Sequence, residues 1–211
     1  QSTAREKLFW DNTIRCETKE LKEGEIKSEN IALPEDFDVP KSILFKTTHT
    51  IAEVWLDGEK IYEYGNEADA PGFMKTPGSC WHIVDIPGDS SGKNLEVRII
   101  PVYEGYYGNE VSLVYGTRGD CILKILTDSL GIPVISCGIL FAAVICILLY
   151  CGAARRKRSD KTEAKIEIFL NLGFFSLLVA VWTLVQCGFL QFLIPDGRTL
   201  YFVEYFSLFL F

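Results

Sequence analysis

The sequence predicts an all-β extracellular sandwich followed by a bundle of transmembrane α-helices. Short apolar stretches separated by turn residues fill the chain as far as Asp128, and a run with no charged residue follows up to Arg155. Charge divides the chain at the same place. Residues 1–128 contain 14 Lys and Arg against 23 Asp and Glu, whereas residues 129–211 contain 7 against 5. We therefore expect two domains, 1–128 and 129–211.

The stretch "IAEVWLDGEKIYEYG" predicts two strands around a tight turn. Ala52, Val54 and Leu56 alternate with polar or amphipathic residues, which places them on one face of a strand. Asp57-Gly58 then supplies a two-residue type I′ turn, because that turn needs positive φ at both positions. A half-buried antiparallel hairpin follows.

Further strands are expected on both sides of this hairpin. Leu95, Val97 and Ile99 alternate in "LEVRII" after the turn residues "PGDSSGKN". "GEIKSENIALPED" predicts one more strand, ending at Pro34. The remaining stretches with this pattern are "SILFKTTHT", "WHIVDIP" and "VSLVYG". Several such units, with a compact part that begins near Lys41, predict a β-sandwich.

The second domain begins with two uncharged runs, each longer than the roughly 20 residues that cross a bilayer core. We predict helices at about 130–152 and 167–194, and the start of a third from residue 200. The other interpretation, buried core helices of a soluble protein, is disfavoured because both runs are so long. The chain starts at a residue other than Met and stops within an apolar run, so we expect it to be part of a longer protein.

The segment "ARRKRSDKTEAK" between the first two runs sets the orientation. It is rich in Lys and Arg, and short basic loops stay on the cytoplasmic side. We therefore expect a multi-pass protein of the cell membrane with loop 153–165 cytoplasmic and residues 1–128 extracellular. Nucleic-acid binding by this basic cluster is disfavoured, because the cluster lies at helix ends and the rest of the chain is acidic.

The order of these pieces resembles a known family. "LFKTTHTIAEVWLDGEKIYEYG", "PGSCWHIVDIP", "LEVRIIPVYEGYYG" and then "ILKIL" before the membrane runs resemble the N-terminal region of bacterial membrane-bound diguanylate cyclases. They are similar also to seven-transmembrane receptors with diverse intracellular signalling modules. The resemblance implies a jelly-roll-like external sandwich, several membrane helices and a cytoplasmic GGDEF domain that makes cyclic di-GMP. No GGDEF motif occurs within the 211 residues.

Aromatic residues are the candidate ligand contacts. Flat rings with a polar edge suit stacking on sugars, and the loops of a rigid sandwich commonly carry binding residues. Core packing is the competing interpretation for each ring taken singly. "YEGYYG" is the better case, because its glycines indicate a loop. The candidate ligand-binding residues are Trp55, Trp81, His82, Tyr103, Tyr106 and Tyr107.

The sequence gives no candidate catalytic residue, metal ligand or cofactor. His49 and His82 lie 33 positions apart without Cys or His partners at ligand spacing. No phosphate-binding loop, GxSxG elbow or dinucleotide fingerprint is present in the sequence. Whether the chain belongs to an enzyme therefore depends on an output domain outside it.

Cysteines, glycines and one carboxylate complete the candidates. Cys16, Cys80 and Cys121 lie in the expected external part. They could form one disulfide, in any of three pairings, or all three could remain free thiols. Small residues let membrane helices approach, so Gly131, Gly138, Gly173 and Gly188 are expected at helix contacts. Glu204 is an ionisable residue near the start of the third helix and is expected at the interface.

The main hypothesis is a signalling receptor. The external sandwich senses a ligand, of which a carbohydrate is one class, and the membrane helices pass the change through "TRGDCILKILTDS" to the output domain. The alternative is a membrane-anchored carbohydrate-binding or adhesion module without enzymatic output. The expected partners are the ligand and the lipid bilayer, with a second copy of the chain as a further candidate and no nucleic acid.

Overall fold

The computed structural model describes residues 13–15, 27–33, 40–66, 72–103, 112–155 and 160–210. The chain divides into two compact units, Gln1–Ile125 and Leu126–Phe211. We call them the sheet unit and the helical unit.

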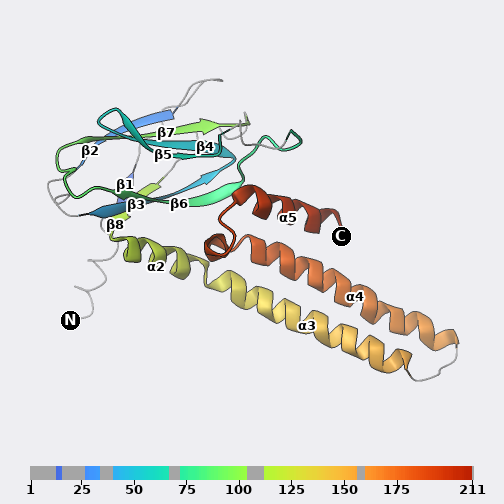
Figure 1. Ribbon diagram of the computed structural model, residues 1–211. Helices are drawn as coiled ribbons and strands as arrows, with labels where there is room; N and C mark the ends of the chain where they lie inside the picture. The colour runs from blue at the N-terminus through green and yellow to red at the C-terminus, as the bar shows by residue number, and fades with distance from the viewer. Residues whose placement is uncertain are drawn as a thin grey trace, which may run out of the picture. The chain divides into compact units, whose positions relative to one another are not determined.

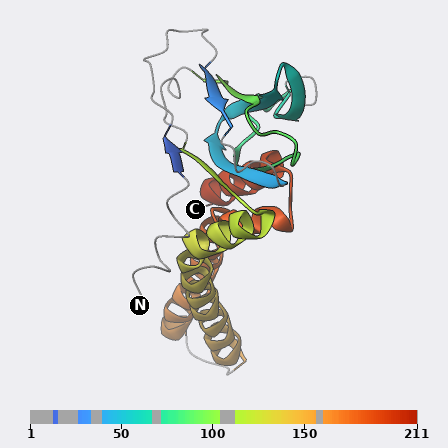
Figure 2. The ribbon, with the colours of Figure 1, turned by 90° about the vertical axis from the view of Figure 1, so that its left-hand side faces the viewer.

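The described strands of the sheet unit form two antiparallel four-stranded sheets, seen as separate layers in Figures 1 and 2. Successive strands along the chain lie in different layers except for β4 and β5, which share one sheet. β1 pairs with β8, β2 with β7, β3 with β6 and β4 with β5. Sheet A contains, in spatial order, β1 (Thr13–Arg15), β8 (Ser112–Gly116), β3 (Lys41–Thr48) and β6 (Ser79–Ile86). Sheet B contains β2 (Lys27–Ala32), β7 (Asn94–Pro101), β4 (Thr50–Leu56) and β5 (Glu59–Tyr64).

The hairpin of β4 and β5 confirms its prediction. Asp57 and Gly58 have φ of 47° and 85°, and Leu56 pairs with Glu59 across them. Positive φ at both turn positions is the condition that Asp-Gly meets at low cost. The pairing register shifts between Val54 and Trp55, so the strand is irregular there.

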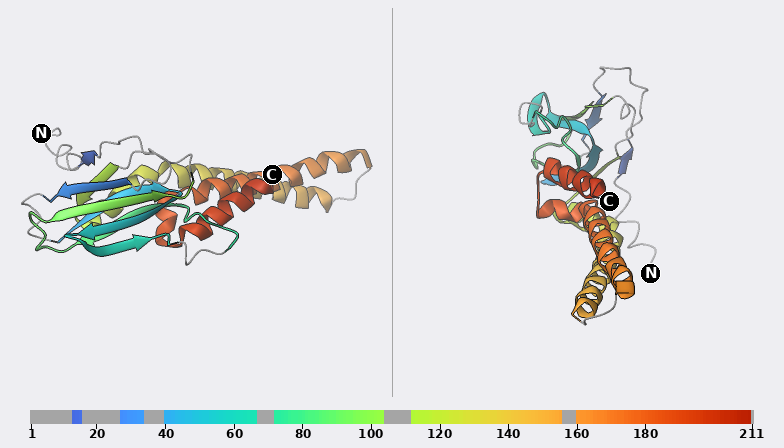
Figure 3. Two further views of the ribbon diagram at one scale, coloured as in Figure 1. Left: turned by 90° about the horizontal axis from the view of Figure 1, so that it is seen from above. Right: turned by 90° about the vertical axis from the view of Figure 1, so that its right-hand side faces the viewer.

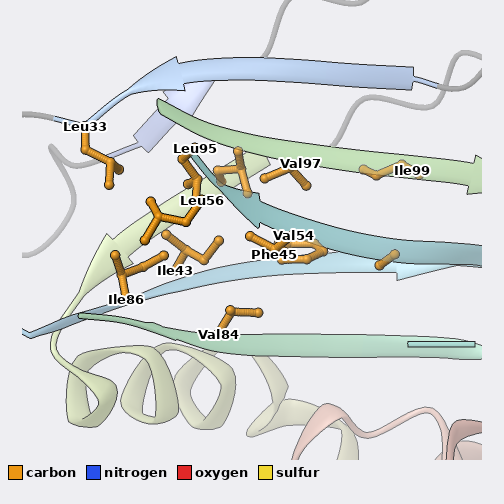
Figure 4. Close-up of a cluster of buried hydrophobic side chains, with 12 residues drawn as sticks. Leu33, Ile43, Phe45, Val54, Leu56, Val84, Ile86, Leu95, Val97 and Ile99 are labelled. Carbon is orange, nitrogen blue, oxygen red and sulfur yellow. The ribbon is translucent and has the colours of Figure 1, made fainter. Parts of the chain in front are cut away.

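The inward faces of the two sheets share one buried apolar cluster. Ala52 and Val54 are fully buried and Leu56 nearly so, and the inward residues of β7 join them as the alternation predicts. Sheet A contributes side chains that point toward them between the layers (Figure 4). The labelled members are Leu33, Ile43, Phe45, Val54, Leu56, Val84, Ile86, Leu95, Val97 and Ile99.

A helix, α2 (Arg118–Ser129), takes the place of the expected link between the last strand and the first membrane run. Thr117 and Asp120 form a reciprocal capping box, in which each backbone N–H donates to the other's side chain at 3.0 and 3.2 Å. Cys121 and Ile125, one turn apart, are buried against Leu44 on the outer face of sheet A. The sequence shows the i, i+4 spacing of a helix here, which the link interpretation overlooked.

The helical unit is built on α3 (Gly131–Ala154) and α4 (Asp160–Val185), which run side by side in Figures 1 and 3. By length and composition, α3 and residues 166–185 of α4 are long and apolar enough to cross a membrane. The fold is therefore two antiparallel sheets plus helices, two of them long and apolar. It is mixed, and the described part of the chain does not form a purely β external domain, because α2 packs on sheet A.

α4 ends earlier than the expected end near residue 194. α4 ends at Val185, and Cys187, two residues later, has an extended backbone. A short 3₁₀ helix, η3 (Gly188–Phe192), follows. α5 (Gly197–Phe209) then begins where Asp196 caps it by accepting from the backbone N–H groups of Arg198 and Thr199. Gln186 donates to Glu204 on α5 at 3.3 Å.

Small and polar residues line the contact between α3 and α4. A Cβ added at Gly173 would meet Cγ1 of Ile147 at 2.8 Å and the carbonyl oxygen of Ala143 at 3.3 Å. Ser136 donates across the helices to Thr183 at 2.9 Å. The predicted close contact is thus confirmed for Gly173. The described residues show no such contact for Gly131 and Gly138, where a Cβ would have no neighbour within 4 Å.

Candidate functional site

β6 places His82 between the two sheets, where its side chain is 1% exposed. Nε2 lies 2.7 Å from Oγ1 of Thr47 on β3, and Nδ1 lies 3.0 Å from the hydroxyl of Tyr62 on β5. A neutral imidazole has one donor and one acceptor nitrogen, so the two hydroxyls take complementary roles. Burial lowers the pKa of His82 to about 3. The ring is therefore neutral at physiological pH and links sheet A to sheet B.

Three aromatic rings enclose this histidine. Phe45, Tyr64 and Tyr62 have ring centroids 4.8, 5.0 and 5.8 Å from that of His82. Tyr64 donates to the carbonyl of Pro77 at 3.1 Å, and its hydroxyl lies 2.9 Å from Sγ of Cys80. Burial raises the pKa of Tyr62 to about 12, so its hydroxyl stays protonated. We call Thr47, Tyr62, Tyr64, Cys80 and His82 the inter-sheet cluster.

The inter-sheet cluster is suited to holding the sheets in register. Its hydroxyl, imidazole and thiol groups bond to one another, and its histidine is inaccessible to solvent. No group of three or more His, Cys, Asp or Glu that could hold a metal ion occurs among the described residues. Cys80 and Cys121 are thiols in the structure. Cys16 lies outside the described residues.

Trp55 lies on the other side of sheet B, on its outer face. The guanidinium of Arg98 lies over the indole ring at 4.5 Å and Nζ of Lys60 at 5.6 Å, while the indole N–H donates to Glu53 at 3.0 Å. Arg98 and Lys60 are paired in turn with Glu96 at 2.7 Å and Glu63 at 2.6 Å. The face is therefore an array of paired charges around one half-buried aromatic ring, which we call the Trp55 face.

Trp81 cannot act together with His82, although the two are adjacent in sequence. Neighbouring residues of a strand point to opposite faces of a sheet. Trp81 accordingly lies on the outer face of sheet A, packed against the cluster of Leu44, Cys121 and Ile125, with Nζ of Lys46 at 5.6 Å from its ring. It contributes to the docking of α2.

Comparison with protein-family models, curated proteins and solved structures finds no match. The assignment of function therefore depends on the residues themselves.

Tyr103 is the remaining described candidate. It is 41% exposed and lies edge-on to His49, with ring centroids 5.9 Å apart. His49 has φ of 54°, which is uncommon for a residue other than glycine, and Nδ1 lies 2.7 Å from Oγ1 of Thr76. Burial lowers the pKa of His49. Tyr106 and Tyr107 lie outside the described residues.

The structure thus does not bring the four described candidate ligand residues into one site. Trp55, Trp81, His82 and Tyr103 occupy four different surroundings. Sequence reasoning missed the partners of His82, namely Thr47, Tyr62, Tyr64 and Cys80. The alternation of "SCWHIVDI" carries the signal for Cys80, because it places that residue on the same face as His82.

Proposed function

We propose that residues 1–211 are the sensory and membrane part of a signalling receptor. In this proposal the sheet unit is an extracellular, jelly-roll-like sandwich. Two four-stranded sheets whose strands pair as 1–8, 2–7, 3–6 and 4–5 support it, because jelly rolls have eight strands in two sheets. The helical unit is a multi-pass membrane region with residues 153–165 cytoplasmic, supported by the basic residues of that loop.

The geometry of α2 is the observation that carries the proposal. Its first turns are fixed to sheet A, because Cys121 and Ile125 are buried there and Arg118 pairs with Asp85 on β6. Leu130 alone separates its last residue, Ser129, from Gly131, where the first apolar helix begins. A helix transmits rotation and displacement that a flexible linker would absorb. α2 is therefore the element through which binding outside would bias the membrane helices.

The proposed output is a diguanylate cyclase outside residues 1–211, on the resemblance described above. The test replaces Thr127 and Asp128, both exposed, with glycines in cells that express the whole receptor. Gly-Gly weakens the helix by about 1 kcal/mol per residue relative to Ala-Ala, the matched control. We expect the Gly-Gly variant to change the basal cyclic di-GMP level and the Ala-Ala variant to leave it unchanged. Equal levels in wild type and both variants, at equal expression, would contradict the proposal.

The orientation is tested separately with thiol labelling in intact cells. Glu59, at the tip of the β4–β5 hairpin, and Arg155, after α3, are exposed positions for cysteine substitution. A membrane-impermeant maleimide should label Glu59→Cys in intact cells and Arg155→Cys only after lysis, above the background of the native cysteines. Labelling of both before lysis would contradict the proposed orientation.

A carbohydrate is the ligand class that we propose for the Trp55 face. Sugar hydroxyls pair well with the carboxylates of Glu53 and Glu63 and with the guanidinium of Arg98. Because Arg98 already lies over the indole, a sugar would bind to the polar groups around the ring. Titration of the chain in nanodiscs with defined glucan and galactan oligosaccharides should change tryptophan fluorescence in wild type and not in Trp55→Phe. No response to any of them would rule out these sugars.

A further inference from the structure

Three segments that are distant in sequence meet at one end of the sheet unit. The backbone N–H of His49 donates to the carbonyl of Gly78 at 2.9 Å, and the carbonyl of His49 accepts from the N–H of Val102 at 3.1 Å. These bonds join the β3–β4 turn, the β5–β6 connection and the end of β7. We call the described residues of this end the rim: His49, residues 72–78, Val102 and Tyr103.

The described part of the β5–β6 connection has a buried base, residues 76–78, and an exposed segment, residues 72–75. Thr76, Pro77 and Gly78 are buried, and Oγ1 of Thr76 accepts from the N–H of Gly78 at 3.0 Å. Gly65 has φ of 86°, and a Cβ at this position would lie 2.7 Å from Pro77. The base is therefore packed too closely for another side chain. Before this base, Gly72, Phe73 and Lys75 are exposed and Met74 is half-buried.

Phe73 is 79% exposed. Among the described residues of the sheet unit, the exposed large apolar or aromatic side chains are Phe73, Tyr103 and Leu123, and two of the three belong to the rim. A single exposed apolar residue is normal on a protein surface, whereas exposed apolar residues that gather at one place often mark a contact. Phe73 and Tyr103 both belong to the rim, so the rim is a candidate contact surface.

We propose that the rim inserts Phe73 and Tyr103 into the bilayer–water interface, which rests on the proposed membrane location. Phenylalanine supplies an apolar ring, and tyrosine combines a ring with a hydroxyl that favours the headgroup level. Lys75, also exposed, can extend its ammonium group to lipid phosphates. The connection along the chain is short: α2 is 12 residues long, about 18 Å, and only Leu130 separates it from the first apolar helix, so a bilayer that contains this helix would lie within reach of the sheet unit.

The apolar character of the exposed ring, and not charge, supports the choice of lipid. Phe73 has no polar atom with which to orient a soluble polar ligand, and its neighbours Gly72 and Met74 are uncharged. The adjoining segments 67–71 and 104–111, which lie outside the described residues, contain acidic residues in the sequence. A neutral phosphatidylcholine bilayer is therefore the appropriate probe.

The test places a tryptophan at position 73. Phe73→Trp is compared with Glu59→Trp, an exposed position at the β4–β5 turn, which is at the opposite end of those strands from Gly65. Both chains are reconstituted in phosphatidylcholine nanodiscs with or without lipids brominated near the headgroup end of the acyl chain. The fluorescence of each added tryptophan is taken as the difference from the wild-type chain.

We expect bromine to quench the tryptophan at position 73 about twofold, since interfacial side chains are buried roughly 5–10 Å into the headgroup and acyl boundary. The tryptophan at position 59 should be unaffected. Equal quenching at the two positions, or a blue shift at position 73 without bromine quenching, which indicates a protein contact, would overturn the proposal. Trp182 within α4 distinguishes the two hypotheses. If the wild-type chain shows no quenching, the proposed membrane location fails, whereas quenching of Trp182 without quenching at position 73 overturns the rim proposal alone.

Discussion

The two units of the chain are built on opposite patterns. In the sheet unit the contacts between the layers are apolar, as with Phe45 and Val54, and the outer face carries paired charges around Trp55. In the helical unit the contact is made by Gly173 and the hydrogen bond from Ser136 to Thr183, while large apolar side chains point outward. Val134, Phe141 and Leu148 are each more than 60% exposed.

The difference is explained if the sheet unit is surrounded by water and the helical unit by lipid, as proposed. In water, burying apolar surface drives association, so the sheet unit places its largest apolar side chains inside. In lipid, apolar side chains gain nothing by meeting, and helices associate through close packing and hydrogen bonds between small and polar residues. The outward apolar faces of α3 and α4 therefore support the proposed membrane location. Four changes, in order of expected effect, test this contrast.

The largest effect is expected for Phe45→Ala in the core of the sheet unit. Phe45 is fully buried, so its removal should lower the free energy of unfolding of the sheet unit by about 3–5 kcal/mol. Phe73→Ala, which removes the same side chain from an exposed position, should change it by less than about 0.5 kcal/mol. Urea denaturation of the reconstituted chain, followed by fluorescence, measures both. Similar losses in the two variants would show that Phe45 is not a core residue.

Acid should weaken the inter-sheet cluster. The pKa of His82 is about 3 in the folded chain and 6.5 when unfolded, so only the unfolded chain gains a proton as pH falls below 6.5. Stability from this group is thus complete above pH 6.5 and falls below it, by up to about 1.4 kcal/mol per pH unit until pH 3.

Unfolding at pH 7 and pH 5 measures this dependence. We expect a loss of about 2 kcal/mol in wild type from this group, and a clearly smaller loss in His82→Gln, whatever the absolute stability of the variant. An unchanged difference between the two pH values in His82→Gln would show that the buried imidazole is not responsible.

A third change adds one methyl group to the helical contact. Gly173→Ala should lower the stability of the α3–α4 pair by about 1–2 kcal/mol, because the Cβ presses on Ile147 and on the carbonyl of Ala143. Gly138→Ala adds the same methyl group where no atom lies within 4 Å and should be neutral or slightly stabilising. The resistance of the reconstituted chain to unfolding by SDS measures the pair. A greater loss for Gly138→Ala would contradict the described packing.

The smallest effect concerns the cap of α2. Thr117→Ala removes the hydroxyl that accepts from the N–H of Asp120 and should cost about 1 kcal/mol. Thr117→Ser keeps the hydroxyl and should restore most of the loss. Hydrogen exchange of the α2 amides measures the difference. Equal exchange in Ala and Ser variants would exclude the capping box as a determinant of α2 stability.

The sequence was sufficient where a local rule decides the structure. The alternation around Val54 and the Asp57-Gly58 turn predict the β4–β5 hairpin, because side-chain period and backbone φ are local properties. The long apolar runs likewise predict α3 and most of α4, because their length and composition are visible in the chain. These features require no knowledge of which strands meet.

Sequence reasoning was insufficient where the structure depends on distant partners. His82 looks like a candidate ligand residue until Thr47 and Tyr62, from two other strands, are seen to occupy its nitrogens. The segment of α2 looks like a simple link in the sequence, and only its packing against Leu44 of sheet A shows why Cys121 and Ile125 are buried. Such contacts join segments that no local pattern relates, so the candidate site could not be assembled from the sequence.

The nested pairing of the strands has a consequence for how the chain folds. β4 and β5 are joined by two residues, and each further pair, β3 with β6, β2 with β7 and β1 with β8, closes a longer loop around the one before. Loop-closure entropy rises with length, so we expect zippering from the central hairpin outward. β8 precedes α2 directly and lies in the outermost pair. We therefore expect α2, which leads to the apolar helices, to pack against sheet A only after the other strands of the sheet unit have paired.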